Sequence, residues 1–213
     1  MEFLHEEGIM HRKVTPECVW VNSGGFAQLA DLGCSKEMSG QQQFTMIGDP
    51  SYFAPEQVTS MGHTHLIDFW SLGVLIYEML TGSLPFGDIL TPETELYKNI
   101  SSYDPTAGED VWSKVENEAE ISEAGKDLVK LLLNPEATSR LGGGQQGVQE
   151  IKNNNWLAGM DWEKLGSGRV KAPHSEYASE RMRSNNDSAV EKSWIESCEE
   201  VALEDCPETF QAF

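Results

Sequence analysis

The chain has 213 residues with 35 acidic and 15 basic side chains, which gives a formal net charge of −20 at pH 7. So acidic a balance argues against nucleic acid or an anionic membrane surface as the partner, and it suits a protein that binds basic peptides. Residues Met1–Glu7 lack the basic start of a signal peptide, and no apolar run reaches the ~18 residues of a membrane span, so we expect a soluble chain. Reduced thiols, and a cytoplasmic or nuclear location, are expected because no metal or redox spacing relates Cys18, Cys34, Cys198 and Cys206.

The first elements in chain order are a helix end and a hairpin. Met1–Glu7 is typical of the last turns of a helix that Gly8 closes, and a chain that opens in this way predicts missing sequence upstream. Two β-rich runs, Cys18–Asn22 and Phe26–Ala30, are joined by a Ser-Gly-Gly turn, which is a strong hairpin signal. The loop before the hairpin and the segment after it should therefore emerge at the same end.

The next part of the chain predicts helices. Asp68–Thr81 is apolar almost all round, as a buried core helix is, and Gly82 should end it. Further helices are expected at Thr91–Ile100, Ser122–Leu133 and Val148–Trp156. From about residue 166 the chain is polar and rich in Ser and Asn, as a tail is. The expected fold class is mainly α with a small β-hairpin.

A series of short motifs runs in one order through most of the chain. It consists of His11-Arg12-Lys13, Asp31-Leu32-Gly33, Gly48-Asp49-Pro50, Ala54-Pro55-Glu56, Asp68-x-Trp70, Pro85-Phe86, Arg140-Leu141-Gly142 and a terminal Phe210-x-x-Phe213. In this order the series resembles the AGC group of serine/threonine protein kinases, near the branch that depends on cAMP or cGMP. A single Asp-Leu-Gly would mean little, whereas this many motifs in register make the resemblance specific.

The resemblance implies the large lobe of a protein kinase-like fold at residues 1–165 and an AGC-type tail at residues 166–213. No segment matches the small lobe's Gly-rich loop, the lysine of its V-A-I-K strand or its helix glutamate. In the family the terminal Phe-x-x-Phe packs into a pocket on the small lobe. Phe210 and Phe213 are therefore expected to bind a kinase small lobe in trans.

The same resemblance implies that the catalytic residues are lost. Lys13 stands in place of the catalytic Asp, and as a cationic donor it cannot take the proton of a substrate hydroxyl. Cys18 replaces an Asn that binds a second magnesium ion, for which sulfur is too soft a ligand. Thr15 replaces the lysine that holds the transferred phosphate, and Asp31 remains as a magnesium ligand or as a cap of its own loop. We expect ATP and Mg²⁺, the family's cofactors, to bind poorly.

Two further expectations concern the catalytic loop. Trp20 stands where the family has a small residue under the adenine, so its indole should block the base, fold back into the hairpin or pack as core. Relative to the family, Lys13 replaces an Asp, Thr15 replaces a Lys and Asp49 replaces a Thr, so the charges are exchanged and not deleted. We expect Lys13 and Asp49 to form an ion pair that keeps the loop in a kinase-like shape. The alternative is that the two positions are unrelated.

Other positions match the family's structural and regulatory residues. Glu56 and Arg140 should form a buried ion pair, and Asp68 should accept backbone N–H bonds from the His11-Arg12 turn. The resemblance also implies a phosphorylated activation loop. Its residues are Thr45 as the phosphosite, with Arg12 and Lys36 as the phosphate-binding cations.

Peptide docking is the function that these features favour. Glu17 and Glu78 match the family's acceptors of substrate arginines, and an apolar pocket beside them would be lined by Met46, Pro50 and Phe53. We therefore expect an inactive kinase-like module that binds a basic peptide or a regulatory, pseudosubstrate-like protein. The alternatives are an ATP-dependent kinase that phosphorylates Ser or Thr in basic motifs, represented here by a truncated chain, and a truncated lobe without a role.

Overall fold

A computed structural model describes residues 1–22, 24–38, 40–106, 111–115, 121–172 and 175–176. The chain divides into two compact units. The first unit is Met1–Trp20 with Ala27–Val170, and the second is Val21–Phe26 with Lys171–Phe213. The predicted tail motif, Phe210 and Phe213, lies outside the described residues. Within the described part, no helix combines the length and the apolar character that a membrane crossing requires.

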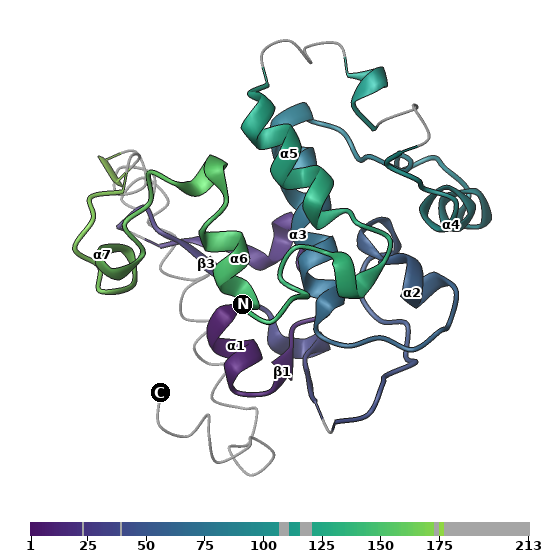
Figure 1. The fold of residues 1–213 in the computed structure, drawn as a ribbon, viewed down its shortest axis with the longest axis horizontal. Helices are drawn as coiled ribbons and strands as arrows, with labels where there is room; N and C mark the ends of the chain where they lie inside the picture. Colours follow the sequence, from purple (N-terminus) through teal and green to yellow (C-terminus); the bar gives the residue numbers. More distant parts are fainter. Residues whose placement is uncertain (23, 39, 107–110, 116–120, 173–174, 177–213) are drawn as a thin grey trace, which may run out of the picture. The chain divides into compact units, whose positions relative to one another are not determined.

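The described secondary structure is mostly helical, with two small strand pairs (Figure 1). The helices are α1 Glu2–Glu6, α2 Pro55–Val58, α3 Leu66–Thr81, α4 Glu93–Ser101, α5 Glu123–Leu132, α6 Val148–Lys152 and α7 Trp162–Gly166. The strands are β1 Ile9–Met10, β2 Val19–Val21, β3 Ala27–Leu29 and β4 Lys36–Glu37. The β2–β3 pair confirms the predicted hairpin. The antiparallel β1–β4 pair, which sets Met10 opposite Lys36, was not predicted because its strands have only two residues each.

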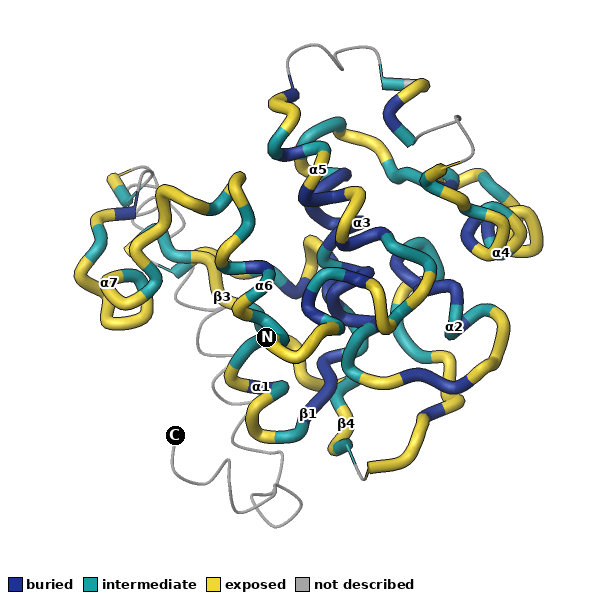
Figure 2. The backbone as a smooth tube through the Cα atoms, in the orientation of Figure 1, coloured by how far each residue is buried: buried dark blue, intermediate teal, exposed yellow. Residues whose placement is uncertain are grey.

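Helix α3 forms the centre of the first unit, as its uniform apolarity predicts. Most of it is buried (Figure 2). Trp70 and Val74 have no exposed surface. It begins at Leu66, two residues before the predicted start, and Gly82 ends it in the left-handed conformation with φ 74°. A Cβ atom at Gly73 would lie 2.9 Å from Leu132 Cβ, so a glycine is needed where α3 and α5 pack together (Figure 1).

The helix ends follow local side-chain chemistry. The hydroxyl of Ser122 caps α5 by accepting a bond from the N–H of Gly125, as predicted. The helix predicted at Val148–Trp156 is too long, because α6 ends at Lys152. Beyond it the side chain of Asn154 accepts a hydrogen bond from the N–H of Trp156 and starts a separate 3₁₀ turn.

Candidate functional site

The loop that follows β1 is fixed to α3 by one buried carboxylate. Asp68 has no exposed surface, and its two oxygens accept bonds from the backbone N–H groups of His11 and Arg12, each at 2.8 Å. This confirms the predicted role of Asp68. A third bond, from His5 Nε2 at 2.8 Å, was not predicted and connects α1 to the same carboxylate. The buried charge is therefore well solvated by donors, as a buried carboxylate requires.

The loop is also held from its other side. His11 is fully buried, and its Nε2 bonds the carbonyl of Ala30 at 3.0 Å. Arg12 adopts a left-handed backbone with φ 64°, and its Nε donates to the carbonyl of Cys34 at 2.6 Å. The hairpin thus brings the segment after β3 back to the loop, as its Gly-Gly turn predicts. His11 and Arg12 act here as scaffold residues.

Lys13 pairs with Asp31 in this structure. Lys13 Nζ donates to Asp31 Oδ2 at 2.7 Å, and both side chains are partly exposed. The hydrogen bond to Asp31 raises the pKa of Lys13, and the same bond, followed by the N–H of Gly33, lowers the pKa of Asp31. Lysine and aspartate therefore stay charged together through neutral pH.

The predicted ion pair between Lys13 and Asp49 is wrong. Asp49 Oδ1 instead accepts the N–H of Ser51 at 2.8 Å and caps the 3₁₀ turn Pro50–Tyr52. The physical reason is the hairpin, which returns Asp31 to the same end as Lys13, whereas Asp49 is engaged by its own turn. Of the two alternatives for Asp31, the structure shows the cap of its own loop, because its Oδ1 accepts the N–H of Gly33 at 3.3 Å, and its role as a magnesium ligand stays a prediction.

Cys18 and Thr15 extend the contacts of Asp31 into the interior. Both residues are fully buried, the hydroxyl of Thr15 donates to Cys18 Sγ at 3.6 Å, and the thiol faces Asp31 Oδ2 at 3.9 Å. An ammonium group and a thiol thus converge on one carboxylate oxygen. The described residues contain no group of three His, Cys, Asp or Glu side chains that could hold a metal ion. The groups that meet at Asp31 are thus an ammonium donor from Lys13 and a thiol from Cys18.

The indole of Trp20 folds back along the chain. Its Nε1 donates to the carbonyl of Glu17 at 3.1 Å, and 45% of the residue remains exposed. The alternative of Trp20 as ordinary core is therefore wrong. The carbonyl of Glu17, three residues earlier in the chain, provides the acceptor for the indole N–H. The sequence position of Trp20 alone could not decide among the three alternatives.

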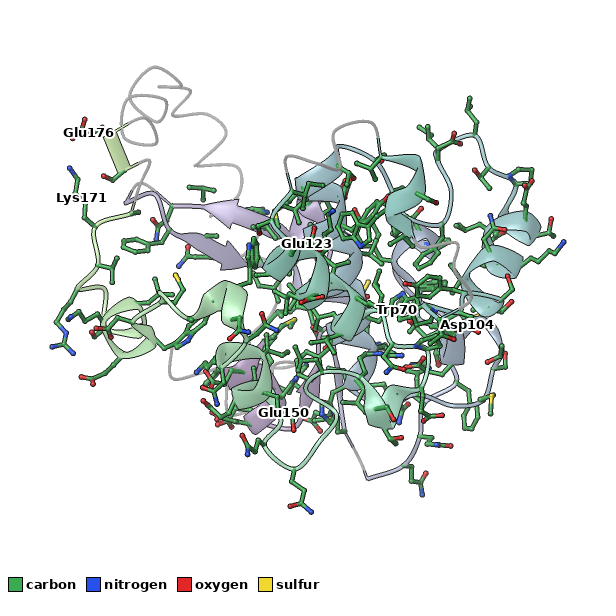
Figure 3. All side chains as sticks on the ribbon, turned by 45° about the horizontal axis from the view of Figure 1, so that its top comes forward. Trp70, Asp104, Glu123, Glu150, Lys171 and Glu176 are labelled. Carbon is green, nitrogen blue, oxygen red and sulfur yellow. The ribbon has the colours of Figure 1, made fainter. Side chains whose placement is uncertain are left out.

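Glu56 and Arg140 form the predicted buried ion pair. Two parallel bonds of 2.8 and 3.0 Å join the guanidinium to the two carboxylate oxygens. Arg140 is 1% exposed, also donates to the carbonyls of Asn134 and Leu66, and lies 5.2 Å from the ring centroid of Trp70, which sits in the interior (Figure 3). The pair locks the start of α2 to the segment after α5.

The two predicted docking carboxylates lie around a buried tyrosine. Glu78 accepts a hydrogen bond from the hydroxyl of Tyr52, and Glu17 is exposed. Burial, followed by the bond to Glu78, raises the pKa of Tyr52, and Glu17 and Asp49 add to the rise through their charges. Because their charges all act on Tyr52, we refer to Glu17, Asp49 and Glu78 as the acidic cluster. The sequence analysis assigned Asp49 to a pair with Lys13 and did not identify Tyr52. Nothing in the sequence around Tyr52, two residues before Ala54-Pro55-Glu56, indicated a role for its hydroxyl.

The predicted apolar pocket residues have different environments. Met46 is exposed and Pro50 is half-buried, but Phe53 is buried and its ring stacks on Tyr97 of α4 with centroids 6.4 Å apart. The apolar pocket of Met46, Pro50 and Phe53 therefore stays a prediction.

A cavity of about 840 Å³ is lined by Glu78 and by residues of the segment after α3. Acidic and apolar side chains share its lining, among them Asp88, Asp104, Phe86 and Ile89. Ile89 is 96% exposed. Sequence reasoning missed this cavity, although the two acidic residues that flank the predicted Thr91–Ile100 helix could have indicated it.

The predicted phosphosite lies in an open segment. Thr45 is exposed, two residues after Gln43, whose backbone exchanges both hydrogen bonds with that of His63. Lys36 is exposed on β4. The backbone geometry connects this segment to the loop between α2 and α3.

A family model of the protein kinase domain matches residues 1–157. The match covers more than half of the 213 residues, and the chain belongs to the protein kinase domain family. Its mostly helical fold and the loop held by Asp68 agree with this assignment.

Several curated relatives are cyclic-nucleotide-dependent kinases. The chain is 34% identical over 175 residues to cGMP-dependent protein kinase 2 of Rattus norvegicus, an alignment that covers 81% of this chain and 21% of the relative. It is 35% identical over 173 residues to cAMP-dependent protein kinase catalytic subunit 3 of Drosophila melanogaster, covering 81% and 27%. It is 33% identical over 173 residues to cAMP-dependent protein kinase catalytic subunit PRKX of Mus musculus, an alignment that covers 81% of this chain and 45% of the relative. The chain thus spans less than half the length of each of these relatives.

Proposed function

We propose that this chain is a catalytically inactive large lobe of an AGC-type kinase domain that binds basic protein segments. The observation that carries the proposal is the 2.7 Å bond between Lys13 Nζ and Asp31 Oδ2. Phosphoryl transfer depends on a carboxylate that receives the substrate proton and on magnesium ions that neutralise the phosphates. Here position 13 offers a donor in place of an acceptor, and that donor neutralises the one remaining carboxylate.

The neighbouring residues support poor binding of Mg²⁺ and ATP. Cys18 supplies sulfur where magnesium requires oxygen, and Thr15 is buried and directed at Cys18. A divalent ion would have to displace the ammonium group of Lys13 from Asp31. Trp20 presents a large exposed ring at the position that the resemblance assigns to the adenine floor.

The acidic cluster supports a basic peptide as the partner. Glu17 is exposed, and hydrogen bonding to Thr15 lowers its pKa, so it remains anionic at neutral pH. Glu78 uses one oxygen for Tyr52 and keeps acceptor capacity, since a carboxylate has two oxygens. Arginine guanidinium groups bind such carboxylates through paired bonds. The net charge of −20 adds long-range attraction for a basic segment of a regulatory or pseudosubstrate-like protein.

Binding of a labelled Arg-Arg-x-Ala peptide, measured by fluorescence anisotropy, tests the docking role. The variant Glu17→Gln/Glu78→Gln should weaken binding by at least roughly tenfold, because each lost charge-assisted contact is worth about 1.5–3 kcal/mol. The matched control Glu163→Gln removes an exposed carboxylate on α7 and should bind the peptide as the parent chain does. Equal affinity for all three chains would rule out docking at this cluster.

The second candidate function is ATP-dependent phosphorylation of Ser or Thr in basic motifs. The preserved scaffold favours it: Asp31 is retained, Asp68 fixes the loop, and Glu56 binds Arg140. Transfer of radiolabelled phosphate to an Arg-Arg-x-Ser peptide that disappears in Asp31→Asn would establish this activity and refute the inactive assignment. We expect no transfer above the Asp31→Asn background.

A further inference from the structure

The side chain of His5 connects α1 to the central helix α3. It is 8% exposed, and its Nε2 lies 2.8 Å from Oδ2 of Asp68, which has no exposed surface. Asp68 also accepts two backbone N–H groups and acts as an acceptor throughout, so Nε2 carries the proton. The other ring nitrogen, Nδ1, is then a bare acceptor, and it is buried without a hydrogen-bond partner among the described residues. A buried polar atom of this kind requires an explanation.

The ring of His65, the residue before α3 begins, packs against the ring of His5. The two ring centroids lie 4.8 Å apart, and the ring planes meet at 66°, edge to face. Phe69 contacts both rings, with its centroid 5.1 Å from that of His5 and 6.1 Å from that of His65. In an edge-to-face pair, an N–H of one ring is directed at the face of the other and not at the lone pair in its ring plane. The two imidazoles therefore meet without sharing a proton.

The surroundings of the pair oppose a positive charge on His65. Burial lowers the pKa of His65 most, the charge of His5 lowers it further, and Asp68 acts in the opposite direction with a smaller effect. The amino group of Met1 acts on the same carboxylate: burial lowers the pKa of this amine, while Asp68 and then Glu2 raise it. Asp68 is thus shared among several donors, and it only partly offsets the cost of a charge on His65.

A proton on His65 makes the contact between the two rings unfavourable. It places a charge on a partly buried ring against His5 and Phe69, while Asp68 is already bound by three donors. Separation of α1 from α3 exposes the ring to water and removes the repulsion from His5. We propose that His5 and His65 form a pH-sensitive latch, in which α1 stays on α3 while His65 is neutral and leaves it when His65 takes up a proton. The latch does not depend on the peptide-binding function.

The release of α1 is local. Glu2 pairs with Lys152 of α6, which keeps the released segment near the rest of the first unit. Asp68 loses the bond from His5 and keeps those from the two backbone N–H groups of the turn after β1. The pKa of His65 is lowered only while α1 is in place, so the latch is fully closed above pH 6.5 and weakens as the pH falls below it. The loop after β1 thus retains its anchor on α3 when α1 leaves.

Hydrogen exchange of the full chain, followed by NMR between about pH 7.5 and about pH 5, tests the latch. The reporters are the N–H groups of Glu7 and Gly8, whose hydrogen bonds lie within α1 and the turn that ends it. After correction for the intrinsic exchange rate, their protection should fall by up to about tenfold per pH unit below 6.5. An equal fall at the N–H of Leu133, which bonds the carbonyl of Val129 at the end of α5, would indicate global unfolding and overturn the latch.

Two histidine variants and one control complete the test. His65→Asn keeps a polar side chain before α3 and should abolish the fall in protection at Glu7 and Gly8, whereas the matched control His63→Gln should retain it. In an NMR titration of the ring resonances, the pKa of His65 should lie below 6.5 in the parent and rise in His5→Gln, which removes the neighbouring charge. No fall in the parent, or an equal fall in His65→Asn, would overturn the latch. A titration of His65 that His5→Gln leaves unchanged would overturn it as well.

Discussion

Replacement of Arg140 by methionine should destabilise the first unit strongly. The change removes a residue that is 1% exposed and that donates four hydrogen bonds, two to Glu56 and one each to the carbonyls of Asn134 and Leu66. The side chain of Glu56 is only 12% exposed, so its carboxylate would lose its counter-charge in a largely dry environment. Loss of one partner from such a pair costs about 3–5 kcal/mol of unfolding free energy.

The measurement is thermal and urea unfolding followed by circular dichroism. At about 2–4 °C per kcal/mol for a chain of this size, the loss corresponds to a Tm decrease of roughly 6–20 °C. Arg169→Met is the matched control, since it breaks the exposed pair with Glu163 and should cost no more than about 1 kcal/mol.

The double variant Glu56→Met/Arg140→Met separates the ion pair from packing. Removing both charges should recover much of the loss, because an apolar pair has no unpaired buried charge. A loss of under about 1 kcal/mol in Arg140→Met would refute the reasoning, and so would a double variant less stable than the sum of the two single variants.

Three other predictions concern local features. Burial lowers the pKa of His63 in the folded chain below its ordinary value of 6.5, so the unfolded chain binds the proton more readily. The contribution to stability is therefore full above pH 6.5 and should decrease as the pH falls below that value. His63→Phe should flatten this part of a plot of the urea midpoint against pH. Gly82→Ala should cost about 1 kcal/mol in urea unfolding because Gly82 has φ 74°, whereas Gly159→Ala, in open space, should be nearly neutral, and equal midpoints would contradict this. Asp68→Asn should cost about 2–3 kcal/mol and expose the amides of the His11-Arg12 turn to hydrogen exchange, since an amide offers one acceptor for three donors; unchanged protection would argue against this role.

The sequence predicted the elements whose signals are local and strong. The apolar character of α3, the Gly82 stop, the Ser122 cap and the Gly-Gly hairpin all appear where they were expected, within about two residues. The Glu56–Arg140 pair and the role of Asp68 followed from motifs in register, since these contacts depend on backbone positions that the family's fold fixes.

The errors concern partners chosen between several candidates. The sequence offered more than one carboxylate for Lys13, which pairs with Asp31, whereas Asp49 caps its own turn. Among the described residues, Ser35 Oγ and His63 Nε2 are buried without a hydrogen-bond partner, and this could not be predicted because residue types alone do not show which buried atoms are unpaired. The predicted last helix was too long because the side chain of Asn154 competes with the helix backbone for the N–H of Trp156, and the sequence alone does not show which acceptor prevails.

The contact between Lys13 and Asp31 also restricts how this loop could evolve. A return of position 13 to aspartate would set two carboxylates side by side, and their repulsion would oppose the change unless a divalent cation entered. Cys18 supplies no oxygen to hold that cation. If the proposed function holds, an aspartate at position 13 alone is therefore less favourable than the present lysine, and a magnesium site here requires a second substitution at Cys18.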